Sequence, residues 1–132
     1  MTTPAHDVAK YLASLGIGTW AGANTWAIYA FQEPTEPENV ITVYDTGGAG
    51  PDTDEMDWQR PTFQVRVRCK VYRDGYAKHL AIRNALLLTS PITMLTSVFI
   101  GINMTSDIVS LGKLDNNLFA LTANYTAIRK EN

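Results

Sequence analysis

A run near the middle of the chain, in which apolar and polar residues alternate, limits the possible folds more than any other feature. Its odd positions are apolar: Phe63, Val65, Val67, Cys69 and Val71. Its even positions are polar: Gln64, Arg66, Arg68 and Lys70. A period of two is typical of a strand with one face in a core and the other in solvent. The sequence therefore predicts a half-buried strand with a basic outer face.

Helical spacing and turn residues predict the elements on either side of this strand. A helix is predicted over 4–15, where apolar residues recur at helical spacing until Gly16. A second helix has Asp74 as its N-cap, ends at Pro91, and presents an apolar stripe: Tyr76, Leu80 and Leu87. Strands are predicted over 25–31, 40–44, 98–104 and 118–129, with a weaker one at 107–112. The order helix, two strands, loop, strand, helix, two strands predicts an α+β fold with a mostly antiparallel sheet and two helices packed on one face.

The composition fits one soluble globular domain over residues 1–132. Apolar residues make up 45% of the chain and charged residues 18%, values typical of a folded domain. The net charge of −2 excludes a generally cationic nucleic-acid binder, which needs positive charge to neutralise phosphates. No apolar run reaches the ~20 residues that a membrane span requires, and no signal peptide is predicted. We therefore expect no membrane association.

A glycine-rich, acidic segment at 46–61 precedes the alternating strand and suggests a nucleotide or metal site. The stretch TGGAGPDTDE lacks the lysine of a phosphate-binding loop, and its carboxylates would repel a nucleotide. The stretch PDTDEMD lacks the ligand spacing and the turn glycine of a calcium loop. A long acidic loop is therefore the favoured interpretation, and loops of this length in compact domains are usually functional or disordered.

The sequence also lacks a catalytic or zinc-binding set of residues. Cys69 is the only cysteine, and the two histidines, His6 and His79, lie in separate predicted helices. Cys69 falls on the apolar side of its strand, where a cysteine is usually a small buried hydrophobe. His79 is expected at the surface or at its boundary. We predict that the protein is not an enzyme and that it uses no cofactor or metal.

Acidic and basic residues occupy separate parts of the sequence. Eight acidic residues lie between positions 33 and 57, a segment without lysine or arginine. Seven basic residues follow between positions 60 and 83, opposed only by Asp74. Such segregation indicates surfaces of opposite sign, or else a chance difference between loop and strand composition. We interpret the basic strand face as a contact for the acidic loop of a neighbouring copy, with nucleic-acid binding and a plain solvated face as alternatives.

The order of short motifs along the chain resembles one family of phage proteins. The helix DVAKYLASLGIG, the strand WAIYAF and the segments VYDTGG and RPTFQVRVR follow one another as in the tail-terminator or minor capsid proteins of long-tailed bacteriophages. The segments VYRDGY and SLGKLDNNLFALTANYTAIR extend the resemblance over nearly the whole chain. No single motif is diagnostic, and the most specific part is YDTGG with RPTFQVRVR downstream.

The resemblance implies a structural role in the virion. Tail terminators form a six-membered ring that caps the tail tube, stops tube polymerisation and faces the head connector, while DNA passes through the lumen. For this chain the resemblance implies a place in the neck of the tail, reached from the host cytoplasm. The implied partners are further copies of the chain, the tail tube protein and a head connector or neck protein.

The 46–61 loop matches the loops by which family members contact the tube or line the channel. The loop residues expected at that interface are Gly47, Gly48, Asp52, Asp54, Glu55, Asp57 and Trp58. The residues expected between subunits are the basic ones on the outer strand face: Arg66, Arg68 and Lys70. Two other functions stay open: another head-to-tail joining protein, such as a connector or tail-completion factor, and a small nucleic-acid-binding module.

Overall fold

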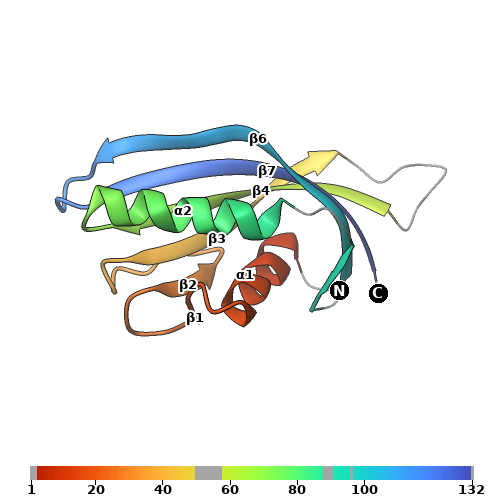
Figure 1. Ribbon diagram of the computed structural model, residues 1–132, viewed down its shortest axis with the longest axis horizontal. Helices are drawn as coiled ribbons and strands as arrows, with labels where there is room; N and C mark the ends of the chain where they lie inside the picture. The colour runs from red at the N-terminus through yellow and green to blue at the C-terminus, as the bar shows by residue number, and fades with distance from the viewer. Residues whose placement is uncertain (1–2, 50–57, 88–90, 96, 132) are drawn as a thin grey trace.

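The computed structural model describes residues 3–49, 58–87, 91–95 and 97–131 of the chain. Two helices in this part of the chain, α1 (Pro4–Ser14) and α2 (Tyr72–Leu86), lie against one sheet (Figure 1). Seven strands form the described sheet: β1 (Thr19–Trp20), β2 (Ala27–Ala30), β3 (Val40–Ala49), β4 (Trp58–Cys69), β5 (Ile92–Met94), β6 (Ser97–Lys113) and β7 (Phe119–Glu131). The α+β class predicted from the sequence is confirmed.

The strands lie in the order β1-β2-β3-β4-β7-β6-β5 across the sheet. β1 pairs with β2 in parallel, as β2 does with β3, and the other neighbours are antiparallel. The sheet is therefore mixed, although mostly antiparallel. The element order differs from the prediction by two short strands, β1 and β5. Their two and three residues are too few to show a period of two in the sequence.

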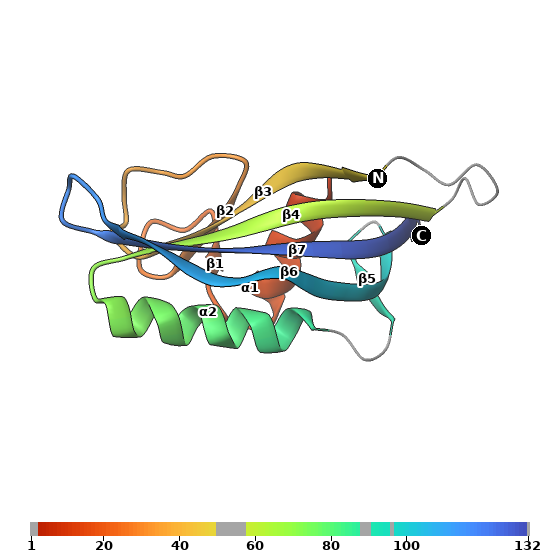
Figure 2. The ribbon, with the colours of Figure 1, turned by 90° about the horizontal axis from the view of Figure 1, so that it is seen from above.

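The two strands predicted over 98–104 and 107–112 are one long strand, β6. Its register against β7 shifts at four places: Phe99/Gly101, Met104/Ser106, Ser106/Val109 and Ser110/Lys113. At each shift β6 holds one residue more than β7 between the paired positions. Extra residues in one strand bend it and increase its twist, and Figure 2 shows the long β6–β7 ribbon curving along α2.

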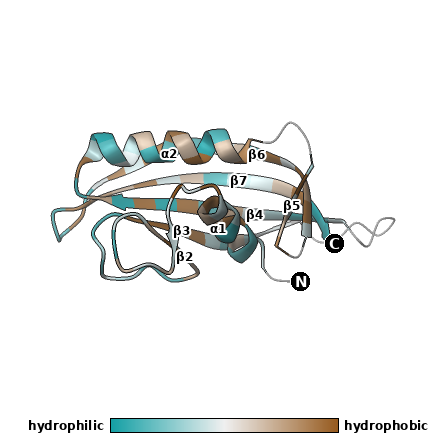
Figure 3. Cartoon of the chain, turned by 60° about the horizontal axis from the view of Figure 1, so that its bottom comes forward, coloured by the Kyte–Doolittle hydropathy of each residue, from teal (hydrophilic) through white to brown (hydrophobic). Residues whose placement is uncertain are grey.

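The core lies between the sheet and the two helices. The odd residues of β4 point into it, and Phe63, Val65 and Val67 are fully buried, as the alternation predicted. Both helices contribute residues to the same core cluster: Ala5, Val8, Ala9, Leu12, Ile82 and Leu86. Figure 3 shows α1 and α2 in front of strands that pass behind them. Burying one large apolar side chain in such a core stabilises the fold by roughly 1.5–3 kcal/mol.

The two helices begin in different ways. α1 begins where predicted, because the Thr3 hydroxyl accepts a hydrogen bond from the His6 N–H at 3.3 Å and Pro4 suits the first turn. α2 begins earlier than predicted, directly after Val71, so that Asp74 lies in its first turn and is not the N-cap. Gly75 lets this turn approach β4 closely, since a Cβ there would lie 2.3 Å from the Cys69 sulfur.

A buried ion pair joins α1 to β7. The Asp7 carboxylate is fully buried and lies 3.2 Å from Nη1 of Arg129, a residue that is 4% exposed. The Ser97 hydroxyl donates to the same carboxylate oxygen at 2.5 Å, and Nε of Arg129 donates to Oε1 of Gln59 at 3.0 Å. One charged cluster therefore connects α1, β4, β6 and β7.

His79 is buried on the inner face of α2, so the expectation of a surface or boundary position was wrong. Its ring faces β7, where Nε2 lies 3.0 Å from the Leu121 carbonyl oxygen. Because a carbonyl only accepts, Nε2 carries the proton, and Nδ1 has no hydrogen-bond partner among the described residues. The buried stripe of the helix is Gly75, His79, Ile82 and Leu86. The predicted stripe of Tyr76, Leu80 and Leu87 lies beside the buried one. The prediction counted apolar residues, and two of the buried residues are a glycine and a histidine.

We expect the free energy of unfolding to decrease as the pH falls below about 6.5, the ordinary pKa of histidine in an unfolded chain. Burial lowers the pKa of His79 in the folded state, and the hydrogen bond with Leu121 opposes that shift. The unfolded chain then binds a proton that the folded chain does not, so this contribution is complete above pH ~6.5 and is lost below it. Urea titrations between about pH 5 and pH 7.5 measure the effect. A His79→Gln variant should show a flatter dependence, and an unchanged slope would assign the effect to other groups.

Candidate protein-interaction sites

The predicted 46–61 loop is shorter in the structure, because both neighbouring strands continue into it. β3 runs to Ala49 and β4 begins at Trp58, with Gly47 opposite Thr62 and Gly48 opposite Pro61. β7 pairs with the other edge of β4 here, since Trp58 lies opposite Lys130. β3 and β4 therefore form a hairpin within the sheet, and their described ends make up both sides of the 46–61 segment. Four predicted loop residues lie outside the described residues: Asp52, Asp54, Glu55 and Asp57.

The two glycines shape the base of the hairpin. Gly47 and Gly48 have φ angles of +98° and +114°, values that favour glycine, and the strand register shifts between Asp45 and Gly47. A Cβ on Gly48 would lie 2.3 Å from the Arg60 carbonyl oxygen, so the two backbones approach closely here. Trp58 is half-buried, and the Lys130 amine lies 5.1 Å from the centre of its ring. These three predicted residues therefore set the shape of the hairpin base.

Two of the three predicted basic residues bind a segment of their own chain. Nε of Arg66 lies 3.1 Å from Oε1 of Glu33, and Nη1 of Arg68 lies 3.5 Å from Oε2 of the same carboxylate. Arg68 is only 4% exposed. Its guanidinium donates to four carbonyl oxygens of the linker that follows β2: Pro34 (2.7 Å), Thr35 (3.0 Å), Pro37 (2.6 Å) and Glu38 (3.3 Å). Arg68 therefore holds the linker against β4.

The linker and the basic strand thus account for part of the charge segregation inside one chain. Pro34 and Pro37 have no N–H, so the linker cannot form a regular helix or strand ladder. Its carbonyl oxygens therefore need donors from elsewhere, and an arginine offers five N–H donors. The prolines and glutamates mark an irregular acidic linker in the sequence, but they do not show which strand the linker covers. Lys70, just after β4, is exposed, and its backbone N–H donates to Oδ1 of Asn39 at 2.9 Å.

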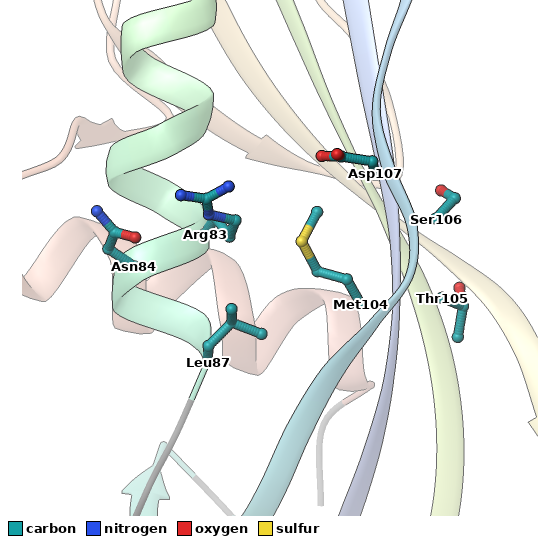
Figure 4. A pocket seen from close by; sticks show the side chains of 7 residues that line it. All are labelled: Arg83, Asn84, Leu87, Met104, Thr105, Ser106 and Asp107. Atoms are coloured by element: carbon teal, nitrogen blue, oxygen red, sulfur yellow. The ribbon is translucent and has the colours of Figure 1, made fainter.

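An open groove of about 460 Å³ lies between α2 and β6, and we call it the α2–β6 groove. Its lining residues come from the end of the helix and the middle of the strand: Arg83, Asn84, Leu87, Met104, Thr105, Ser106 and Asp107. Met104 and Asp107 point from β6 toward α2, where Arg83 and Leu87 face them (Figure 4). The groove therefore offers two apolar side chains together with one positive and one negative charge.

A buried tyrosine hydroxyl lies close to this groove. Tyr125 is fully buried, and its hydroxyl has no hydrogen-bond partner among the described residues. Burial raises the pKa of Tyr125 to about 12; the Arg83 charge opposes this shift and the Asp107 charge adds to it. Tyr125 pairs with Met104 in the β6–β7 ladder, and Met104 lines the groove, so the buried ring lies next to the groove wall.

A second candidate surface lies beside α1, and we call its four residues the Phe31 patch: His6, Lys10, Trp20 and Phe31. The His6 ring stacks on Trp20 with 5.1 Å between ring centres and meets the edge of Phe31 at 6.3 Å. The Lys10 amine lies 5.0 Å from the centre of the Trp20 ring. Phe31 is 54% exposed and has a φ of +73°, a strained value for a residue with a side chain. The patch therefore holds an exposed aromatic ring next to a positive charge.

A comparison with models of protein families decides which family this chain represents. The model described as bacteriophage tail terminator protein matches residues 11–131, which include the hairpin and the α2–β6 groove. The chain belongs to the bacteriophage tail terminator family. The family predicted from the order of motifs is therefore confirmed.

One solved structure similar to this tail terminator family member shows the same fold at low sequence identity. A chain from a structure titled the virion of a native gene transfer agent particle aligns with a TM-score of 0.61 and 13% identity. The alignment covers 94% of this chain and 86% of that chain. A second solved chain aligns over 95% of this chain and 96% of its own length, with a TM-score of only 0.42 and 14% identity. No curated protein matches the sequence significantly.

Because it belongs to this family, the protein is a structural protein of the phage tail and not an enzyme, as predicted. Among the residues that the structure describes, no three His, Cys, Asp or Glu side chains gather as metal ligands do. Within the same residues, no helix is long and apolar enough to cross a membrane.

Proposed function

We propose that this protein caps the tail tube as a closed ring of six copies, ends tube polymerisation and joins the tail to the head connector. The observation that carries the proposal is the family match over residues 11–131. In this proposal the chain acts as one domain over 1–132 in the neck of the virion, after synthesis in the host cytoplasm. Its partners are the tail tube protein and a connector or neck protein, and DNA passes through the ring without specific binding.

The β3–β4 hairpin is the proposed contact with the tube or the lumen. Its base is fixed by the close approach of Gly48 to β4 and by the pairing of Trp58 with β7. A fixed base limits the conformational entropy that is lost when the hairpin end binds. Four acidic residues of the hairpin supply the charge for this contact: Asp52, Asp54, Glu55 and Asp57.

The basic strand face has a narrower proposed role between subunits than the sequence suggested. Arg66 and Arg68 act there through the linker that they hold, because Glu33 and the linker carbonyls already occupy their guanidinium groups. Lys70 is exposed and presents its charge directly to a neighbouring copy. Opposite charges at such a contact set orientation more than affinity.

A variant with Asp52, Asp54 and Asp57 changed to Asn and Glu55 changed to Gln tests the role of the hairpin. We expect native mass spectrometry to show rings of six copies for the wild type and the variant. Electron microscopy of tail tubes assembled with each protein should show capped tubes of defined length only with the wild type. Asp115→Asn, a change at an exposed position in the β6–β7 turn, is the matched control and should cap normally.

Two results would contradict the proposed function. A wild-type chain that stays a monomer, alone and with tubes, would contradict the ring. A wild-type ring that binds the isolated head connector but never the end of a tube would instead identify another head-to-tail joining protein.

A further inference from the structure

Half of the large apolar side chains that are exposed in the described residues belong to three consecutive parts of the chain. Five of the ten lie on the end of α2, the β5–β6 turn and β6: Leu87, Leu95, Ile100, Val109 and Leu111. Their exposed fractions range from 38% to 51%. They do not all share one face: Val109 lies opposite Thr122, which lies opposite Arg66, so Val109 belongs to the sheet face away from α2. Leu87 instead lines the α2–β6 groove, where an exposed apolar side chain meets charged ones. The lining of this groove indicates what kind of side chain it accepts.

The groove suits an incoming side chain better than an incoming strand. β5 pairs with β6 only as far as Phe99. Beyond Phe99, β7 is the only strand of the described residues that pairs with β6, so the other edge of β6 is open. Two of the β6 bulges, between Met104 and Ser106 and between Ser106 and Val109, fall at the groove. Bulges interrupt the regular spacing of backbone groups that a new strand needs, and they redirect side chains. The edge is therefore protected against strand addition.

The lining of the groove favours an aromatic ring beside a positive charge. An arginine binds the face of an aromatic ring through cation–π attraction, and the sulfur of a methionine makes favourable contacts with such rings. Arg83 and Met104 lie on opposite walls, and Leu87 adds apolar surface. Asp107, exposed on the β6 wall, provides a partner for a cation beside the ring.

The Phe31 patch presents this combination at the opposite edge of the same sheet. Phe31 follows β2, which is second from one edge, whereas β6 is second from the other. Its exposed ring is already held against His6, so binding orders few additional rotors. Lys10 supplies the positive charge, and the described outward residues of α1 include no carboxylate, because Asp7 is buried.

We infer that the α2–β6 groove of one copy receives Phe31 of the next copy, with Lys10 of that copy paired to Asp107. The inference rests on the proposed ring, for which it names the contact between subunits. Two unlike patches on opposite edges make a head-to-tail interface, and such interfaces close into a ring when the rotation between neighbouring copies returns to the first copy, as the proposed ring of six requires. The match of individual groups points to the second copy as the occupant, because the groove carries Asp107 for Lys10 and Arg83 for the exposed aromatic ring.

Truncation of the aromatic ring is the first test. Phe31→Ala should weaken ring assembly about ten-fold or more, as expected for an aromatic anchor at the centre of an interface. Analytical ultracentrifugation over a range of concentrations measures the effect, and circular dichroism checks that the variant is folded. Tyr76→Ala is the matched control, because it too removes an exposed aromatic ring. Tyr76 is 40% exposed and lies in the part of α2 away from the groove, so this variant should assemble like the wild type.

A charge exchange separates direct contact from a structural effect. Lys10→Asp and Asp107→Lys should each weaken assembly, since each places two like charges together. The double variant restores an opposite pair in the reverse sense and should recover most of the loss. A structural role for either residue within its own chain predicts additive losses and no recovery.

The outcomes distinguish this inference from the proposed function. If the wild type forms a ring and the Phe31→Ala variant assembles equally well, the inference is overturned and the ring stays in place. A charge exchange without recovery has the same consequence. A wild-type chain that forms no ring, alone or on tail tubes, overturns both. Loss of assembly in Phe31→Ala together with recovery in the charge exchange supports the contact.

Discussion

Replacing Arg129 with methionine should lower the free energy of unfolding by about 3–5 kcal/mol, the usual effect of removing one partner from a buried ion pair. The change leaves the fully buried Asp7 carboxylate without the guanidinium that lies 3.2 Å away. The Ser97 hydroxyl still donates to Asp7, but a hydrogen bond from a hydroxyl does not replace a positive charge in a buried site. Urea unfolding at neutral pH, followed by circular dichroism, measures the loss.

Two further variants show whether this loss comes from the uncompensated charge. Arg73→Met removes an arginine whose side chain is 90% exposed and 3.9 Å from Asp74, and it should change stability by less than ~1 kcal/mol. The double variant Asp7→Leu/Arg129→Met should recover much of the stability, because apolar pairs often replace buried ion pairs without loss. If the double variant is as unstable as the single one, packing around Arg129 and not the charge of Asp7 dominates.

Replacing Arg68 with glutamate should lower the free energy of unfolding by at least ~3 kcal/mol and release the linker from β4. The change removes hydrogen bonds from a charged group to four carbonyl oxygens, each worth about 1.5–3 kcal/mol by mutational estimates, and these losses are not fully additive. It also places a carboxylate beside Glu33, where like charges repel. Denaturant unfolding gives the stability, and hydrogen exchange of residues 32–39 reports release of the linker.

The matched control for this variant is Arg66→Glu, on the same strand face. The Arg66 side chain is 26% exposed and forms its ion pair with Glu33 at the surface, so we expect a loss of about 1 kcal/mol or less. Equal losses at the two positions would show that the linker carbonyls do not depend on Arg68. Because Arg68 is needed within its own chain, assembly experiments on the basic face should use Arg66 and Lys70.

Much of the fold could be predicted where one local signal decides the structure. The alternation from Phe63 to Cys69 identified the buried face of β4, and Thr3 and Pro4 marked the start of α1. Parallel pairing of the two-residue β1 could not be predicted, since two residues carry no period. The continuity of β6 was also hidden, because each bulge interrupts the alternation that identifies a strand.

Prediction of the candidate sites was less complete, because a site depends on residues far apart in the sequence. The hairpin position was found from its glycines and acids, although its strands extend further than expected. The α2–β6 groove and the Phe31 patch were missed. The residues of the groove come from α2 and β6, which are separated by a turn and β5. The residues of the patch come from α1 to the end of β2, and no local pattern marks Phe31 as exposed. His79 was misplaced because burial of a histidine depends on a carbonyl from β7.

The sequence by itself determined the α+β class, the two faces of β4, the start of α1 and the family. These features follow from the period of side chains along one segment, from helix-capping chemistry and from the order of motifs. Only the tertiary structure decided which charges face solvent. A strand's period shows that Arg66, Arg68 and Lys70 share one face, but not what covers that face. The linker folds across it and binds Arg68, while Lys70 stays exposed, because long-range contacts and not local spacing determine where a charge is buried.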